Sequence, residues 1–140
     1  MSQHDDEMEV VTLQDLLEDG RFEEAEHLLG MAEAAGESWA ASLRALCLAE
    51  LDRPDDAVAA AERGVATEPS SAFGHWTLGA LQCDRNYLTE AMTSAEEALR
   101  LDSGDSAHWA LVAQIHAKRG RWSECLEAAQ QGLARHPGDE

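Results

Sequence analysis

Residues 57–64 read AVAAAERG, and similar stretches that begin and end on small residues return as AMTSAEEA at 91–98 and CLEAAQQG at 125–132. Successive stretches start 34 positions apart. A further copy, AEHLLGMA at 25–32, precedes the first of these by only 32 positions. A regular period of this length indicates a stack of similar structural units, each of which buries its apolar face only against its neighbours.

The spacing of apolar residues within each unit predicts two helices joined by a tight turn. In the second unit, Ser38 is the expected N-cap of a helix that runs to about Leu51, and a second helix starts at Pro54 and ends near Thr67. The four units carry these residues at the turn: Gly20, Asp52, Asn86 and Gly120. Glycine and asparagine accept the left-handed backbone that a sharp reversal between antiparallel helices requires. Because strand-like alternation is missing from the sequence, we predict an all-α chain of about eight helices.

Small residues also recur two turns into the second helix of every unit. The series is Ala32, Gly64, Ala98 and Gly132. A glycine inside a helix costs about 1 kcal/mol relative to alanine. We expect Gly64 and Gly132 to mark places where two helix backbones cross too closely for a larger side chain.

With these features the chain resembles the tetratricopeptide repeat (TPR) family over roughly residues 6–138. The third unit matches the family pattern through Leu78-Gly79, Ala91, Ala98 and Leu99, and the fourth through Trp109, Gly120, Trp122 and Pro137. The chain departs from the pattern where Trp76 follows the expected aromatic position by one residue, and where Arg44 replaces a usual apolar residue.

The resemblance implies a single domain, a right-handed α-α superhelix of four repeats, flanked by an acidic tail at 1–5 and a short tail at 139–140. The repeats are expected at about 6–37, 38–71, 72–105 and 106–138, the first of them shortened by two residues. In this family the first helices line a concave groove, and the usual role is to bind peptides or partner proteins.

The groove predicted from this geometry is apolar at its centre and acidic along one edge. The expected partner-binding residues are Val10, Trp39, Leu43, Leu46, Phe73, Trp76 and Leu111. The expected acidic edge is Glu18, Glu50 and Asp84. Cationic side chains that could hold a terminal carboxylate are nearly missing from the predicted groove positions. We therefore expect a partner segment with apolar anchors and basic flanks. For Trp76, both a groove position and a core position are open.

The shortened first unit predicts an unusual junction with the second. Glu26 and Glu33 stand where the second unit has valines that face the following unit. Burying unpaired carboxylates is costly. We therefore expect a rotated junction, in which Leu28 and Met31 make the contacts in their place.

The last helix raises a second functional possibility. Leu126 and Leu133 occupy inter-unit contact sites, but no fifth unit follows them. They form an exposed patch, a homodimer contact, or a boundary within a longer protein. A structural self-association element is accordingly the alternative to a partner-binding module.

Charge and composition exclude several other classes. The chain holds 28 acidic and 10 basic residues, a formal charge of −18, which disfavours binding to nucleic acids and anionic membranes. No stretch is long and apolar enough to insert into a bilayer, and the acidic start does not resemble a secretory signal. Three widely spaced cysteines on apolar faces indicate core thiols in a reducing compartment. We expect a cytoplasmic protein.

Catalytic and cofactor motifs are weak. The six histidines show no i, i+4 pairing and no cysteine at metal-ligand spacing, and neither a phosphate-binding loop nor a nucleophile elbow occurs. We therefore predict a non-enzymatic scaffold or interaction module with no cofactor and no metal; an enzyme or metalloprotein is the least favoured class.

Overall fold

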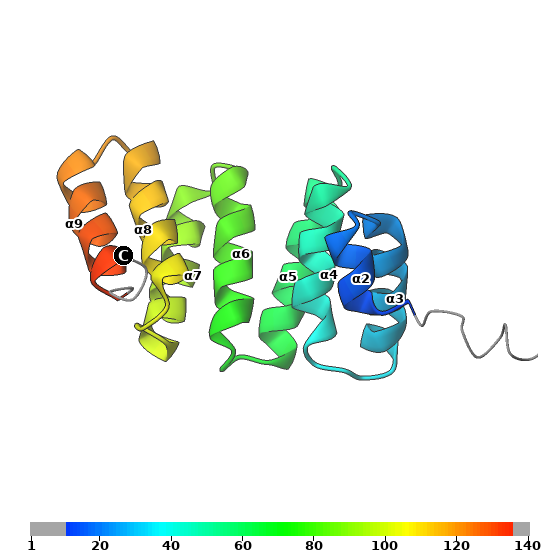
Figure 1. The fold of residues 1–140 in the computed structure, drawn as a ribbon. Coiled ribbons are helices and arrows are strands. Elements are labelled where there is room, and N and C mark those ends of the chain that lie inside the picture. Colours follow the sequence, from blue (N-terminus) through cyan, green and yellow to red (C-terminus); the bar gives the residue numbers. More distant parts are fainter. Residues whose placement is uncertain (1–10, 136–140) are drawn as a thin grey trace, which may run out of the picture.

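The computed structural model describes residues 11–135, and these residues contain eight α-helices and no strand. The helices are α2 (Leu13–Glu18), α3 (Phe22–Ala34), α4 (Ala40–Glu50), α5 (Pro54–Thr67), α6 (Ala72–Asp84), α7 (Leu88–Leu101), α8 (Ser106–Lys118) and α9 (Trp122–Ala134). They form four antiparallel hairpins that stack side by side in chain order (Figure 1). The all-α prediction is confirmed; the predicted tails at 1–5 and 139–140 lie outside the described residues.

The four hairpin turns share one backbone conformation. The turn residues have these positive φ angles: Gly20 73°, Asp52 59°, Asn86 63° and Gly120 73°. In each turn the next residue donates its backbone N–H to a carbonyl five positions earlier, as Arg53 does to Leu48 at 3.0 Å. This pattern satisfies carbonyl groups that the helix end leaves without partners. The left-handed conformation expected from the sequence is confirmed, including at the two positions that are not glycine.

Helix starts differ from one unit to the next. The prediction that Ser38 caps the first helix of the second unit is wrong: α4 begins at Ala40, and Trp39 occupies the N-cap without a side-chain bond to the helix. Instead, the Ser38 hydroxyl donates to Glu68 Oε2 at 2.9 Å and ties two loops together. Pro54 does stand at the first position of α5, where its missing N–H costs nothing.

Close helix crossings explain the glycines of the repeat. A Cβ added at Gly64 would lie 2.1 Å from the hydroxyl oxygen of Ser42 and 3.0 Å from its backbone nitrogen. At Gly132 it would lie 3.1 Å from Trp109 Cβ. The prediction that both positions mark close backbone approach is confirmed. They join α5 to α4 and α9 to α8, so they hold the two helices of a hairpin together.

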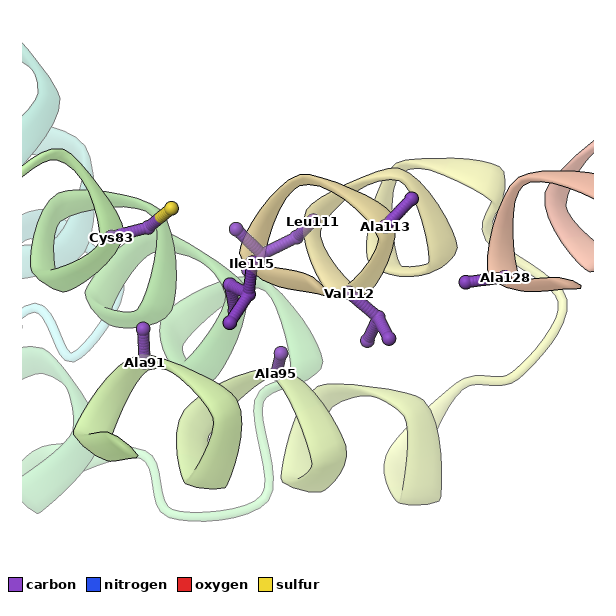
Figure 2. Close-up of a cluster of buried hydrophobic side chains, with 8 residues drawn as sticks. All are labelled: Cys83, Ala91, Ala95, Leu111, Val112, Ala113, Ile115 and Ala128. Atoms are coloured by element: carbon purple, nitrogen blue, oxygen red, sulfur yellow. The ribbon is translucent and has the colours of Figure 1, made fainter. Parts of the chain in front are cut away.

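The core runs along the stack as a series of small clusters rather than as one centre. Figure 2 shows one cluster, to which α6, α7, α8 and α9 contribute: Cys83, Ala91, Ala95, Leu111, Val112, Ala113, Ile115 and Ala128. Two of the three cysteines, Cys47 and Cys83, are buried as free thiols, and burial raises the pKa of both. A buried thiol with a raised pKa is a poor nucleophile, which fits a packing role.

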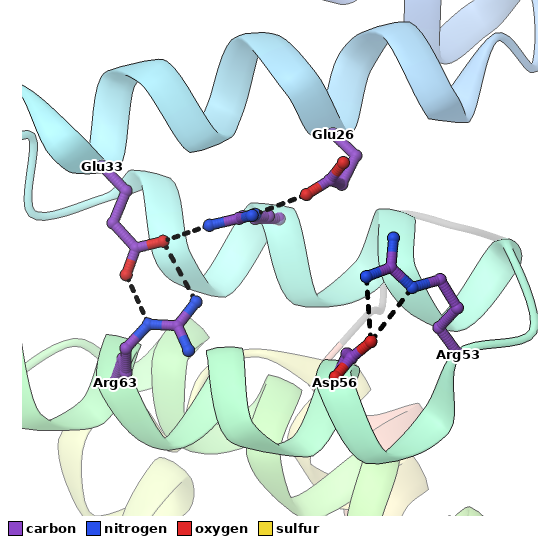
Figure 3. A network of polar contacts seen from close by, with 6 residues as sticks. Glu26, Glu33, Arg53, Asp56 and Arg63 are labelled. Atoms are coloured by element: carbon purple, nitrogen blue, oxygen red, sulfur yellow. Dashed lines mark hydrogen bonds and ion pairs between the residues drawn. The ribbon is translucent and has the colours of Figure 1, made fainter.

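The junction between the first two hairpins is polar, contrary to expectation (Figure 3). Leu28 and Met31 are exposed, whereas Glu26 and Glu33 remain at the interface, with 14% and 21% of their side chains exposed. Arg44 on α4 reaches both: its Nε is 2.7 Å from Glu26 Oε2, and its Nη1 is 3.0 Å from Glu33 Oε1. The expected rotation is unnecessary because one guanidinium compensates both carboxylates.

Two further contacts complete this charged junction. Arg63 on α5 binds the second oxygen of Glu33, with Nε 2.6 Å from Oε2. Gly30 lies beneath the Arg44 guanidinium, whose central carbon would be only 3.3 Å from a Cβ at that position. The unusual arginine noted in the sequence thus links α4 to α3, and Glu33 extends the network to α5 through Arg63. At the next junction the equivalent contacts are apolar, with Val58 and Val65 packed against the core.

Candidate functional site

The first helices of the hairpins present a face on which large aromatic rings are only partly covered. Trp39 and Phe73 occupy equivalent positions in neighbouring units, and 45% and 44% of their surfaces are exposed. Trp39 donates its indole N–H to Glu37 Oε1 at 3.1 Å, which fixes its orientation at the start of α4. We call the surface formed by Trp39, Leu43, Leu46, Phe73 and Trp76 the aromatic face.

Trp76 takes part in both the core and the aromatic face, the two positions that the sequence left open for it. Its partly buried side chain packs against the core cluster of Cys83, Ala91 and Ile115. The ring also stacks on Phe73, with centroids 6.1 Å apart and planes inclined by 28°. The two residues are three positions apart on α6, the spacing that places side chains on one helix face. The core therefore supports Trp76, and Trp76 in turn supports the exposed ring of Phe73.

The aliphatic residues predicted for the groove fall into two groups. Leu43 and Leu46 on α4 are partly buried, and each keeps some surface toward the solvent. Leu111 is only 3% exposed and belongs to the core cluster of α8, so its prediction as a groove residue is wrong. Gly79 on α6 makes room for the Leu111 side chain, because a Cβ added at that glycine would lie only 3.0 Å from Leu111 Cδ2. Val10 lies outside the described residues.

The acidic residues predicted for one edge are exposed, and they share a structural position. Glu18, Glu50 and Asp84 are the last residues of α2, α4 and α6. A carboxylate at a helix C-terminus adds to the negative end of the helix dipole, so these positions do not favour helix stability. The fourth unit breaks the series: Lys118 ends α8 and donates to the carbonyl oxygen of Cys83 at 2.8 Å. The edge is therefore negative over the first three units.

A pocket of about 250 Å³ opens beside the aromatic face, between the start of α6 and the loop that leads into α8. It is lined by Ala72, Phe73, Trp76, Asp102, Asp105, Ala107 and His108. The groove residues predicted from the sequence lie on the first helices or at their starts, whereas both aspartates come from the α7–α8 loop, so the prediction did not include this pocket. The signal in the sequence is the run Asp102-Ser-Gly-Asp-Ser, which places two aspartates close together in one loop.

Hydrogen bonds within the loop fix the polar side of this pocket. Asp102 Oδ1 accepts from the Gly104 N–H at 3.0 Å, and Asp105 Oδ1 accepts from the Ala107 N–H at 2.9 Å. His108 is 4% exposed, and its Nδ1 lies 2.8 Å from the carbonyl oxygen of Asp102. Since a carbonyl only accepts, Nδ1 is the donor. The other ring nitrogen, Nε2, faces Asp105 Oδ2 at 3.8 Å, beyond hydrogen-bond distance.

Residues 11–135 hold neither a group of candidate metal ligands nor a membrane-spanning helix. No cluster of three or more histidine, cysteine or acidic side chains with the geometry of a metal site occurs in this range. None of its helices combines the length and the apolar character needed to cross a bilayer.

Comparison with known proteins identifies the fold. No protein-family model matches the sequence, and no curated protein matches it. Solved structures do match: a crystal structure of MamA has a TM-score of 0.78 at 15% identity over 94% of this chain and 78% of that one. MamA from residue 41 of the Desulfovibrio magneticus RS-1 protein gives 0.79 at 14% identity, over 91% and 73% of the two chains. YrrB, described as a TPR protein with an unusual peptide-binding site, gives 0.76 at 16% identity, over 89% and 66%.

The chain has the tetratricopeptide repeat fold. At these identities the likeness concerns the arrangement of helices and not the residues of any site. The TPR arrangement makes the equivalence of α4, α6 and α8 explicit, and places Trp39 and Phe73 at the same point of successive repeats.

In a TPR stack the second helix of each repeat is covered by the repeat that follows, and within the described residues α9 lacks such a cover. In α7, Met92 and Leu99 pack against the core cluster of the next hairpin. Their equivalents in α9, Leu126 and Leu133, are 60% and 75% exposed, and Trp122 is also exposed. The outer side of α9 is thus a second apolar surface, distinct from the aromatic face.

Proposed function

We propose that this TPR chain is a non-catalytic protein–protein interaction module whose aromatic face binds a segment of a partner protein. The observation that carries the proposal is the repeated exposure of a large ring, Trp39 in one repeat and Phe73 in the next. Exposed aromatic rings that a rigid scaffold holds in place are typical anchors of binding energy. The described peptide-binding site of YrrB, on the same fold, supports the choice of a peptide or protein partner.

The expected partner segment has apolar anchors and basic flanks. Apolar side chains of the partner would cover Trp39, Phe73 and the exposed parts of Leu43 and Leu46. Lysine or arginine residues on either side would face the acidic edge, which Glu18, Glu50 and Asp84 form at the C-terminal ends of their helices. Complementary charge of this kind speeds association and sets orientation more than it raises affinity. Binding is therefore expected to weaken with salt but to survive it.

The aromatic anchors can be tested with a displayed library of random peptides, followed by fluorescence polarisation of the enriched sequences. We expect enrichment of apolar segments flanked by Lys or Arg. Trp39→Ala and Phe73→Ala should each weaken binding about 30-fold, and the double variant several hundred-fold, because each anchor contributes about 2 kcal/mol and tenfold in affinity corresponds to about 1.4 kcal/mol. Trp39→Ala alone should leave the melting temperature nearly unchanged, because nearly half of the ring is already exposed.

Tyr87→Ala is the matched control, since Tyr87 is an equally exposed aromatic residue at the turn before α7. It should bind like the wild type. Loss of binding with Tyr87→Ala, or full binding without Trp39 and Phe73, would show that the aromatic face is not the binding surface. Collapse of the fold in Trp39→Ala would make Trp39 a core residue.

The outer side of α9 supports a second function, self-association with another copy of this chain. The equivalent apolar residues of α5 and α7 pack against the hairpin that follows them. Leu126 and Leu133 are therefore suited to pack against a helix of another copy. If copies pair there, sedimentation equilibrium should show a concentration-dependent dimer, and Leu126→Glu/Leu133→Glu should reduce it to monomer. Ala66→Glu, on the exposed side of α5, should leave it intact. A monomer at all concentrations would exclude this function.

A further inference from the structure

We infer that the pocket beside Phe73 and Trp76 binds the side chain of one basic residue, preferably arginine, from the partner segment. This inference rests on the proposed function and adds to it a specific recognition site. It places one basic residue of the partner at a defined position, next to the residue that covers Phe73.

The size of the pocket suits a single side chain. Its volume of about 250 Å³ lies below the roughly 300–1,000 Å³ of typical small-molecule sites. Its apolar walls are the stacked rings of Phe73 and Trp76, with the methyl groups of Ala72 and Ala107 beside them. Such walls fit the methylene stem of a long side chain better than a compact polar group.

The charges of the pocket select a cation. Its seven lining residues include two aspartates and no lysine or arginine. Each aspartate uses Oδ1 to accept a backbone N–H of its own loop. These bonds hold both carboxylates at the pocket, and among residues 11–135 neither Oδ2 atom accepts a hydrogen bond, so both can take a donor from the partner.

His108 gives the independent sign that the pocket is built for a donor. The imidazole is buried, and its Nδ1–H is committed to the Asp102 carbonyl oxygen at 2.8 Å. In the neutral ring this leaves Nε2 as an acceptor on the pocket wall, facing Asp105 without a hydrogen bond. A guanidinium carries several N–H donors in one plane, so it can serve a carboxylate and the imidazole nitrogen together while stacking on an aromatic ring. An ammonium group makes fewer of these contacts at once.

The test adds one of two probes to the ¹⁵N-labelled protein, N-acetyl-arginine methylamide or the uncharged N-acetyl-norleucine methylamide. The protein signals are followed by ¹H–¹⁵N NMR. We expect the arginine probe to shift the indole N–H of Trp76 and the amide of Ala107 in a saturable manner, and the norleucine probe to leave them largely unmoved. Asp102→Asn/Asp105→Asn should weaken the arginine response about three- to tenfold, the range expected for two solvent-exposed ion pairs. Asparagine keeps both loop hydrogen bonds and is itself a good N-cap, so the loop should stay folded.

Glu62→Gln/Glu127→Gln is the control, because it removes two exposed carboxylates on α5 and α9 that belong neither to the pocket nor to the acidic edge. It should not change the response to arginine. Equal shifts with norleucine, or an undiminished arginine response in Asp102→Asn/Asp105→Asn, would overturn the inference. A library that yields no binding peptide would instead contradict the proposed function, while the probe titration still reports on the pocket.

When peptides are found, a second measurement connects the pocket with the partner. Replacing each basic residue of an enriched peptide by norleucine should identify one position whose loss weakens binding to the wild type but not to Asp102→Asn/Asp105→Asn. If every basic position behaves alike in both proteins, the aromatic face binds the peptide and the pocket does not.

Discussion

Gly64→Ala is expected to destabilise the chain by about 1–3 kcal/mol, even though alanine is the better helix former. The new Cβ would lie 2.1 Å from the Ser42 hydroxyl oxygen, which can rotate away. It would also lie 3.0 Å from the Ser42 backbone nitrogen, which moves only if α4 moves. The two helices of the second hairpin would have to separate, and the contacts of both with the first and third hairpins would loosen. Urea unfolding measures the loss.

The double variant Gly64→Ala/Ser42→Gly tests whether this crossing is the cause. Removal of the Ser42 side chain takes away the hydroxyl and the Cβ, the latter 3.2 Å from the added methyl group. The two substitutions should therefore cost less together than the sum of their separate effects. Ala66→Gly, on the exposed side of the same helix, gives the pure propensity cost of glycine. If Gly64→Ala is as stable as the wild type, the crossing has more room than the structure indicates.

The sequence predicts the repeating parts of this structure well because they depend on local chemistry. Asp52 and Asn86 take the left-handed conformation that their turn position requires, and Pro54 starts α5. Gly64 and Gly132 stand at close crossings, as their small size suggested. Because the same kind of residue stands at the same position in all four units, an exception in one unit does not obscure the pattern.

The junction between the first two repeats could not be predicted from the sequence, although its parts were recognised separately. Arg44 stood out as a departure from the TPR pattern, and Glu26 and Glu33 as carboxylates at contact sites. What joins them is a contact between residues 18 and 11 positions apart on different helices. Periodicity gives the face on which a residue lies but not the length and direction of a long side chain that compensates a charge. For this reason the sequence pattern predicts contacts by Leu28 and Met31, which the structure leaves exposed.

The candidate site was predicted in part for a similar reason. Trp39 and Phe73 are recognisable from their equivalent positions, and their exposure agrees with that interpretation. Leu111 occupies the position equivalent to the partly exposed Leu43, yet it is buried in the core cluster to which α6, α7, α8 and α9 contribute. The pocket combines α6 with the α7–α8 loop, and a comparison of equivalent positions in the first helices does not include that loop.

Arg44→Leu is expected to destabilise the chain by about 2–3 kcal/mol, somewhat less than the removal of one partner from a fully buried ion pair. It leaves Glu26 without its cation and Glu33 with only Arg63, although both side chains are mostly covered. The triple variant Glu26→Val/Glu33→Val/Arg44→Leu copies the residues of the next junction, Val58, Val65 and Leu78. Because it replaces all three charges with an apolar set that already packs in this fold, it should recover most of the loss. Thermal and urea unfolding of the three proteins compare them directly.

The pH dependence of these variants shows whether charge is the cause. The hydrogen bonds from Arg63 and Arg44, against the opposing effect of burial, hold the pKa of Glu33 below its ordinary value. A carboxyl with a lowered pKa in the folded state stabilises the fold above its unfolded pKa of about 4.3, and this stabilisation disappears as the pH falls through the folded pKa. The stability gap between the wild type and Arg44→Leu should therefore narrow between pH 7 and pH 3.5. General relief of the repulsion among 28 acidic residues acts on both proteins and cancels in the difference. A gap that stays constant over this range would mean that Arg44 acts through packing, with its stem rather than its charge holding α3 against α4.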